Sequence, residues 1–188
     1  MLRLVRTLAL VALLGAGALV SEVASATSMI ALDMEEQAVD STALVEAIVG
    51  EQTPIITDTQ WYTDSKLTIT KVVGGDAPKS VSIRQVGGTH NDRVAYIPGD
   101  ARLVPGQRIV AFIRKVGDQW YFTALGQSVW HLDGEGPDAK VHRDIDHLGL
   151  YQRSSTGHVI PVDQSLPEYE THAELLRAST GLTFGGAQ

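Results

Sequence analysis

The chain has 188 residues, 44% of them hydrophobic and 20% charged, and it contains no cysteine. This length and composition are typical of one globular domain with its own core, and they leave too little chain for two ordinary domains. The absence of cysteine excludes disulfides, thiol nucleophiles, thiolate metal sites and a lipid anchor on a cysteine. A formal net charge of −7 argues against nucleic acid and anionic membrane surfaces as partners.

Residues 1–26 have the three regions of a secretory signal peptide. Two arginines precede the apolar run Leu8–Val20, and Ala24–Ala26 forms an A-x-A cleavage pattern. The apolar run is short for a membrane span, so a short membrane anchor is the less favoured alternative. We predict cleavage after Ala26 and a secreted or periplasmic protein that does not span the membrane after cleavage. Removal of this segment takes away two basic residues and one acidic residue, which leaves a net charge of −8.

A short helix and four strands are expected between Asp33 and Ile97. Asp33 and Glu36 have the spacing of a capping box, which predicts a helix of about two turns. After this helix, apolar and polar residues alternate with the period of two that is typical of strands. A polar connection over Gly50–Gln60, which contains Pro54, is expected to separate the first strand from the second. The expected strands are Ala43–Val49, Trp61–Val73, Ser80–Val86 and Arg93–Ile97.

The most strongly patterned stretch surrounds an unbroken apolar run, Ile109–Ile113, which has turn residues on both sides. A run of that length and composition predicts a strand buried on both faces. Gly117 and Asp118 then suit the two-residue turn of a tight hairpin. Two further strands are expected over Gln119–Leu125 and Ser128–Leu132. Large aromatic side chains contribute most to a core, and the ones expected to be buried here are Trp120, Phe122 and Trp130.

Regular short strands without interspersed helices predict an all-β fold. We expect a small antiparallel β-barrel, with a β-sandwich as the alternative. Long, bent strands favour the barrel, because closure needs strand tilt and coiling. The barrel domain and its short N-terminal helix are expected over 33–132, followed by a C-terminal extension over 133–188. In the extension we expect a linker over Asp133–Asp138, an edge strand over His158–Pro161, and a short amphipathic helix over Tyr169–Ser179 before a frayed tail.

The motifs of common catalytic sites are absent from the sequence. The nearest match to the G-x-S-x-G elbow of serine hydrolases is Gly126–Trp130, which has Trp130 where the second glycine must relieve crowding. Ser128 is better explained as one residue of a strand. There is no G-x-x-x-x-G-K-[ST] loop for phosphate and no G-x-G-x-x-G after a strand. Paired carboxylates for glycoside hydrolysis follow no spacing rule along a sequence and stay open, so no catalytic residue and no cofactor are predicted.

The strongest candidate for a metal site is a short segment rich in histidine and aspartate. Its candidate ligands are His142, Asp144, Asp146 and His147. Imidazoles and carboxylates are ligands for zinc and other transition metals, but His142 and His147 diverge in a helix and face opposite sides of a strand. Arg143 between them adds an unfavourable charge. We therefore predict no metal, unless the fold brings His131 or His158 close enough to complete a ligand set.

Two other segments suggest ligands more weakly. Asp133, Glu135 and Asp138 lie on a glycine-rich stretch and raise the possibility of calcium, but the stretch lacks the twelve-residue register and closing glutamate of a calcium loop. Trp61 and Tyr62 would suit the rim of a sugar or peptide site. We prefer the interpretation that they cap a core.

Four segments of the central region carry a family resemblance: Val45–Gly50, Leu67–Asp76, Ile97–Ile113 and Gly126–Trp130. Together they resemble a group of uncharacterised exported bacterial proteins whose domain is similar to OB-fold barrels of the netrin-like type. The resemblance covers about half of the chain, and its motifs are turns and core positions that report fold more than function. Netrin-like modules include the tissue inhibitors of metalloproteinases, which chelate zinc through an N-terminal cysteine. This chain has Thr27 at the expected mature N-terminus, so that mechanism does not carry over.

These observations favour a secreted, non-enzymatic binding module for a protein or cell-envelope partner. One alternative is a metal-dependent hydrolase or metal-binding protein that uses the His131–His158 region. The other alternative is a structural accessory protein of the envelope. The sequence gives neither the ligand nor the oligomeric state.

Overall fold

The computed structural model describes residues 27–91, 93–145, 148–162 and 168–186. The signal peptide predicted for residues 1–26 lies outside the described residues. Strands make up most of the described part, together with two short α-helices, so the predicted all-β class is confirmed. In chain order the elements are β1 (Thr27–Ile30), α2 (Met34–Val39), β2 (Ala43–Ile56), β3 (Trp61–Gly75), β4 (Ser80–His90), β5 (Arg93–Tyr96), β6 (Arg108–Val116), β7 (Gln119–Phe122), the 3₁₀ turn η2 (Leu125–Ser128), β8 (Val129–Asp133), β9 (Lys140–His142), β10 (Leu148–Arg153), β11 (Val159–Pro161) and α3 (His172–Ala178).

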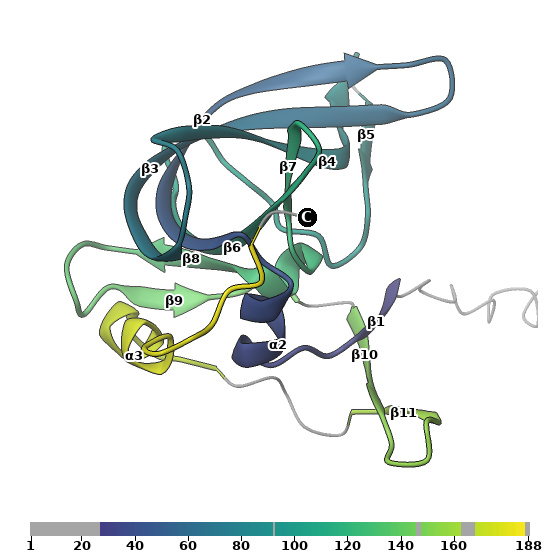
Figure 1. Ribbon diagram of the computed structural model, residues 1–188. Helices are drawn as coiled ribbons and strands as arrows, with labels where there is room; N and C mark the ends of the chain where they lie inside the picture. Colours follow the sequence, from purple (N-terminus) through teal and green to yellow (C-terminus); the bar gives the residue numbers. More distant parts are fainter. Residues whose placement is uncertain (1–26, 92, 146–147, 163–167, 187–188) are drawn as a thin grey trace, which may run out of the picture.

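The larger sheet is strongly curved and has the strand order β2-β3-β4-β7-β6-β8-β9 (Figure 1). β2 pairs with β6 as well as with β3, so the path of pairing returns to its first strand. β4 meets β7 in parallel through the single pair Ile83 and Trp120. β5 lies off this path and pairs with β4. The concave side of the curved sheet therefore encloses a core.

β6 is buried on both faces, as its apolar run predicts. Ile109, Ala111 and Ile113 point into the main core between the curved strands. Val110 and Phe112 point the other way, into a second core that lies against the helices. All five side chains are fully buried. One strand therefore holds the two layers of the molecule together.

The two helices cover the second core. Ala38 of α2 and Leu175 of α3 are both fully buried there, together with Trp130 of β8. The predicted capping box at the start of α2 is confirmed: Asp33 Oδ1 accepts a hydrogen bond from the Glu36 N–H at 2.8 Å, and Glu36 Oε2 accepts one from the Asp33 N–H at 3.0 Å. Figure 1 shows both helices beneath the sheet, so the C-terminal extension packs onto the rest of the fold.

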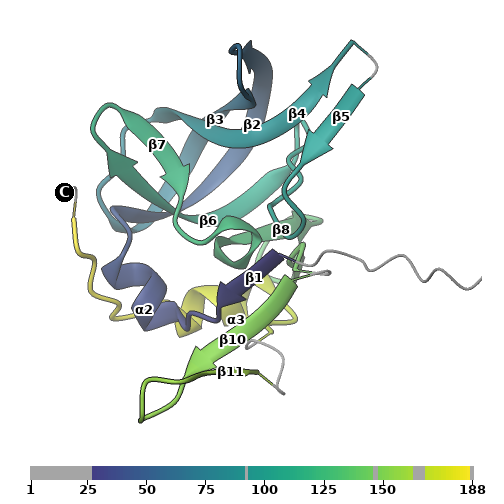
Figure 2. The same ribbon diagram turned by 90° about the vertical axis from the view of Figure 1, so that its right-hand side faces the viewer.

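A second, three-stranded sheet joins the first described strand to the extension. β1 runs parallel to β10 from the pair Thr27 and Leu148 onward, and β11 pairs with β10 on its other side (Figure 2). Gln127, which is fully buried, ties the chain after β1 to η2. Its side-chain N–H donates to the Ile30 carbonyl at 3.1 Å, and its side-chain oxygen accepts from the Leu32 N–H at 3.1 Å.

Two segments that the sequence predicts as loops belong to paired strands or to a hairpin in the structure. The polar connection predicted over Gly50–Gln60 is wrong, because β2 continues to Ile56 and pairs with the start of β3 across a register shift between Val49 and Gln52. In this β2–β3 arm, Gln52–Ile56 pair with Trp61–Ser65 of β3 alone, and a proline that lacks an N–H is tolerated on such an edge. The segment Asp133–Asp138, predicted as a linker, contains the turn of the β8–β9 hairpin.

Candidate functional site

A largely apolar hollow of a size that suits a small ligand lies beside the β4–β5 hairpin. Its volume is about 420 Å³, within the range of small-ligand pockets. Its walls are the outer part of the β2–β3 arm, the last half of β4, β5 and the segment Asp100–Leu103. Figure 2 shows the β4–β5 hairpin extending outward from the larger sheet. The hollow therefore lies where the β2–β3 arm, the β4–β5 hairpin and the segment Asp100–Leu103 meet.

Two glycines allow β4 and β5 to close this end of the fold. Gly87 and Gly88 both have positive φ, at 96° and 130°, a region that L side chains rarely adopt. A Cβ on Gly88 would collide with the Thr63 hydroxyl, and a Cβ on Gly87 would collide with the Ala95 carbonyl. The Thr63 hydroxyl also donates to the Gly87 carbonyl at 2.7 Å. The arm and the hairpin are thus held together through backbone that only glycine permits.

Asp100 is the buried charged group of the hollow. Its side chain is only 9% exposed, and its Oδ1 accepts a hydrogen bond from the Ala101 N–H at 2.8 Å. Burial raises the pKa of Asp100 to about 6, although hydrogen bonds from Gln85 and from the Ala101 N–H favour the ionised form. Gln85 also donates to the Ala101 carbonyl at 2.8 Å. A buried carboxyl with a perturbed pKa that lines a pocket is a typical feature of a functional site.

Exposed apolar and aromatic side chains form the rim. Val94 and Tyr96 of β5 are 67% and 56% exposed. The Arg102 guanidinium lies over the Tyr96 ring, 4.6 Å from its centroid. A second, more open hollow of about 580 Å³ shares Ala95 and Tyr96 with the first and reaches the loop before Trp61. β5 therefore borders two hollows at once.

Trp61 and Tyr62, which the sequence suggests as rim residues or as a cap on the core, have different surroundings in the structure. Trp61 lines the second hollow, and its ring lies edge-on to His90, 5.9 Å between centroids. Tyr62 lies beneath Arg84, whose guanidinium is 5.7 Å from the ring centroid. Both side chains are half-buried.

Of the predicted metal-ligand candidates that the structure describes, His142 and Asp144 both lie next to His131. Asp146 and His147 lie outside the described residues. His142 stacks on His131, with ring centroids 5.1 Å apart, because β8 and β9 pair in a register that places these two residues opposite each other. His142 Nδ1 lies 3.2 Å from Asp133 Oδ2. His158 lies in the β10–β11 hairpin, where its N–H donates to the Ser154 hydroxyl at 3.1 Å.

His131 is the buried member of this pair. Its side chain is 1% exposed and its Nε2 lies 3.2 Å from Asp144 Oδ2, outside hydrogen-bond geometry. Burial lowers the pKa of His131, and the nearby Asp144 carboxylate opposes this shift. In the part of the chain that the structure describes, no three histidine, aspartate or glutamate side chains are grouped so that they would hold a metal ion. The absence of metal stays a prediction.

Ser128 lies in the 3₁₀ turn η2, not in a strand as predicted. Its side chain is fully buried, and its hydroxyl donates to the Leu125 carbonyl at 3.2 Å and accepts from the Ala124 N–H. A buried hydroxyl held by local backbone is poorly placed to attack a substrate. Leu125 has a positive φ of 49°, which gives the turn its sharp bend.

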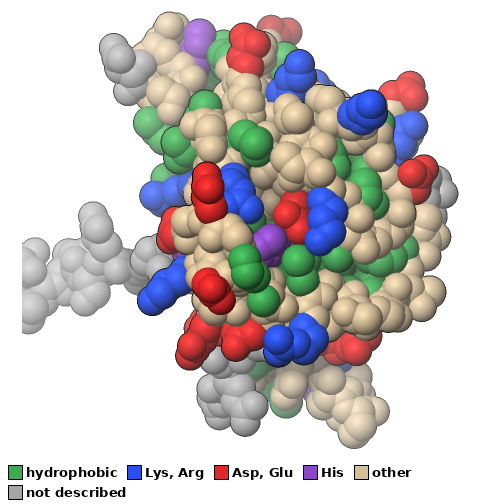
Figure 3. Space-filling view, turned by 90° about the vertical axis from the view of Figure 1, so that its left-hand side faces the viewer, with side chains coloured by type: hydrophobic (Ala, Val, Ile, Leu, Met, Phe, Trp, Pro, Cys, Tyr) green, Lys and Arg blue, Asp and Glu red, His purple; other side chains and the backbone are tan. Residues whose placement is uncertain are grey.

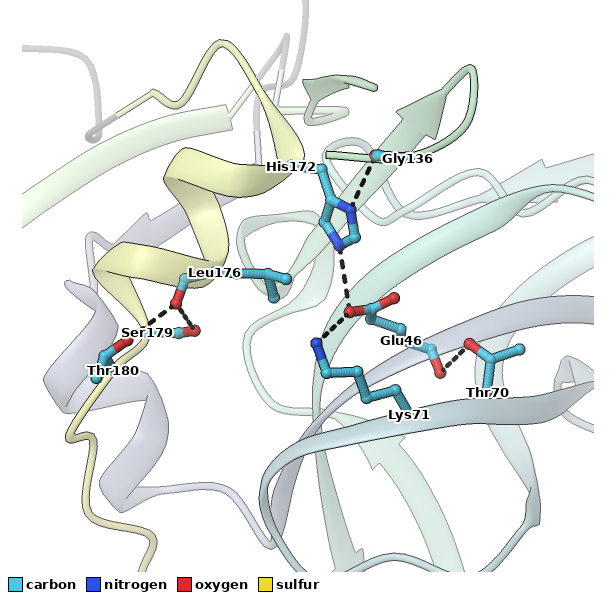
Figure 4. A network of polar contacts seen from close by, with 8 residues as sticks. All are labelled: Glu46, Thr70, Lys71, Gly136, His172, Leu176, Ser179 and Thr180. Carbon is cyan, nitrogen blue, oxygen red and sulfur yellow. Dashed lines mark hydrogen bonds and ion pairs between the residues drawn. The ribbon is translucent and has the colours of Figure 1, made fainter. Parts of the chain in front are cut away.

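A polar network that the sequence does not indicate joins α3 to the larger sheet (Figure 4). His172, at the first position of α3, has Nε2 3.2 Å from Glu46 Oε1 and Nδ1 3.3 Å from the Gly136 carbonyl. The Lys71 ammonium lies 3.1 Å from the same Glu46 oxygen. Figure 3 views the side on which α3 lies, and shows a histidine among acidic, basic and apolar side chains. Both ring nitrogens of His172 face partners, so the network serves to attach α3.

Comparisons with known proteins add no relative to this description. No protein-family model, no curated protein and no solved structure matches the chain. None of the helices in the described part of the chain has the length and apolar character needed to cross a bilayer.

Proposed function

We propose that this chain is an exported, non-enzymatic binding module that takes an extended segment of a partner protein along β5. The observation that carries the proposal is the position of β5. It is paired with β4 on one side, all four of its residues are exposed, and it borders both hollows.

An edge strand of this kind suits the addition of another strand. Along a strand, successive residues point their backbone N–H and C=O to opposite sides. Every second residue of β5 therefore turns these groups away from β4. Main-chain hydrogen bonds to such an edge give affinity, and pockets for alternate side chains give specificity. The exposed Val94 and Tyr96 supply apolar contact at the mouth of the first hollow. Together these features favour a protein partner that presents an extended segment.

The scaffold that we propose is a small closed barrel of the OB-fold, netrin-like type. Pairing of β2 with both β3 and β6 supports closure, as does the parallel pair between β4 and β7. A closed barrel leaves few free edges, which makes the free edge of β5 a feature that calls for an explanation. Binding on a hairpin that projects from such a rigid scaffold is a common arrangement.

The test of this proposal is a selection of short random peptides displayed against the purified protein. Peptides that bind along β5 should lose at least about tenfold in affinity when Val94→Ser and Tyr96→Ser are combined, because each apolar contact contributes on the order of 1–3 kcal/mol. The matched control combines Val159→Ser and Ile160→Ser, two exposed apolar residues of edge strand β11. We expect the control to bind within about twofold of the parent chain.

The proposal fails under either of two results. Selection that enriches no peptide above background would exclude an extended segment as the ligand. Peptides that bind both double variants equally well would place the binding site away from β5.

A further inference from the structure

We infer that the segment bound along β5 carries a basic side chain whose cationic group binds the Asp100 carboxylate. This inference rests on the proposed function and names the chemistry of its partner. It depends on where Asp100 lies, on which other charges face it, and on the charge of the chain.

Asp100 lines the first hollow and lacks a cationic partner from the chain. In the described part of the chain, none of the ion pairs includes Asp100. The walls contributed by β2, β3, β4 and β5 carry no lysine, arginine, histidine, aspartate or glutamate side chain. Tyr96 and Arg102 are the other titratable groups that line the hollow, and the Arg102 guanidinium lies over the exposed Tyr96 ring at the rim.

A buried carboxylate without a cationic partner is costly in free energy, and a cation brought by a ligand reduces that cost. At neutral pH a carboxyl with a pKa of about 6 is mostly ionised. Its attraction to a cation is stronger inside the hollow than in water, because the surroundings there are less polar. The formal net charge of −7 also favours a basic partner over an acidic one. Lysine and arginine side chains have an apolar stem that suits the apolar rim.

The experiment uses the peptides selected on the parent chain at pH 7.5. We expect one position of these peptides to be enriched in lysine or arginine. Replacement of that residue by norleucine, which keeps the apolar stem and removes the charge, should weaken binding at least about tenfold, the effect of a charge-assisted contact. Against Asp100→Asn, the lysine and norleucine peptides should bind within about twofold of each other.

Two further measurements separate Asp100 from general electrostatic attraction. Asp58→Asn removes the same charge from the neighbouring hollow, and we expect it to keep the preference for lysine over norleucine. At pH 5 that preference should shrink on the parent chain, because Asp100 is then largely protonated. An exposed carboxylate with an ordinary pKa stays ionised at pH 5. If lysine were recognised by such a carboxylate, the preference would be largely kept at pH 5.

Each alternative result has a definite meaning. Peptides that bind β5 without a basic residue would overturn this inference and leave the proposed function standing. Equal loss of the lysine preference in Asp58→Asn and Asp100→Asn would overturn it in favour of diffuse attraction. An enrichment of aspartate or glutamate would overturn it and make Arg102 the recognising group. Failure to select any peptide would overturn the proposed function itself.

Discussion

At the scale of single residues, Asp100 makes the stability of the fold depend on pH in an unusual direction. Its folded pKa of about 6 lies above the ordinary aspartate value of about 3.9. Between these two pH values the folded chain holds more protons than the unfolded chain, so the free energy of unfolding falls as pH rises. The contribution is fully present below about pH 3.9 and is lost as pH rises through about 6.

Asp100→Asn should therefore be more stable than the parent chain at pH 7, by on the order of 2–3 kcal/mol. The variant keeps the side-chain oxygen that accepts from the Ala101 N–H, and it removes the buried charge. The advantage should disappear near pH 4, as the parent carboxyl becomes protonated. Urea unfolding of both chains at several pH values measures this difference. Parallel stability curves would show that Asp100 is not desolvated in the folded protein.

At the scale of elements, α3 is attached by a fully buried leucine, by a polar network and by backbone hydrogen bonds from its first turn to the Ala139 and Pro137 carbonyls. Leu175 fills the second core beside Trp130, and His172 reaches Glu46 on the larger sheet. A short helix is marginal without tertiary packing, so these contacts determine whether α3 stays helical.

Leu175→Ala should cost about 2–5 kcal/mol, the usual range for a large-to-small change in a core. Leu176→Ala is the matched control, because the neighbouring leucine is half-buried and should cost much less. Chemical denaturation measures both changes. Equal, small losses in the two variants would mean that α3 is not docked on the second core in solution.

The elements predicted from sequence are right where one strong local pattern decides them. Capping at Asp33 and the unbroken run Ile109–Ile113 specify a helix start and a doubly buried strand. The outer part of β2, beyond Gly50, does not follow from the sequence pattern because it pairs with β3 alone and is largely exposed, so its polar residues and Pro54 resemble a loop. Of the three aromatic residues predicted to be buried, Phe122 and Trp130 are buried. The prediction for Trp120 is wrong, because this side chain packs against the edge of the main core and is half-buried.

The candidate site could not be predicted from the sequence, because its walls come from segments whose residues resemble loops. Its walls come from the β2–β3 arm, the β4–β5 hairpin and the segment Asp100–Leu103, and each of these contains residues that look like ordinary connections. The pairing of His131 with His142 depends on the β8–β9 register, which an apparent linker concealed. A glycine on each side of Glu135 is a local signal of this hairpin turn.

At the scale of the whole molecule, the proposal of export makes a prediction about covalent mass. Cleavage after Ala26 would leave Thr27 as the first residue, so protein recovered from the periplasm or medium should have the mass of residues 27–188. Intact-mass spectrometry measures this directly. Recovery of the full-length chain in the membrane fraction would contradict both the cleavage site and the export that we propose.

The parallel pairing of β1 with β10 also determines when the small sheet can form as the chain is synthesised. Thr27–Ile30 is synthesised first among the described strands, yet its partner strand begins at Leu148. Contacts between distant parts of a chain form late, because the intervening loop must close before the contact contributes. β1 therefore lacks its native strand partner while most of the chain is still being synthesised. Under the proposed export, a chain that crosses the membrane unfolded would complete this small sheet only after Leu148–Arg153 has crossed.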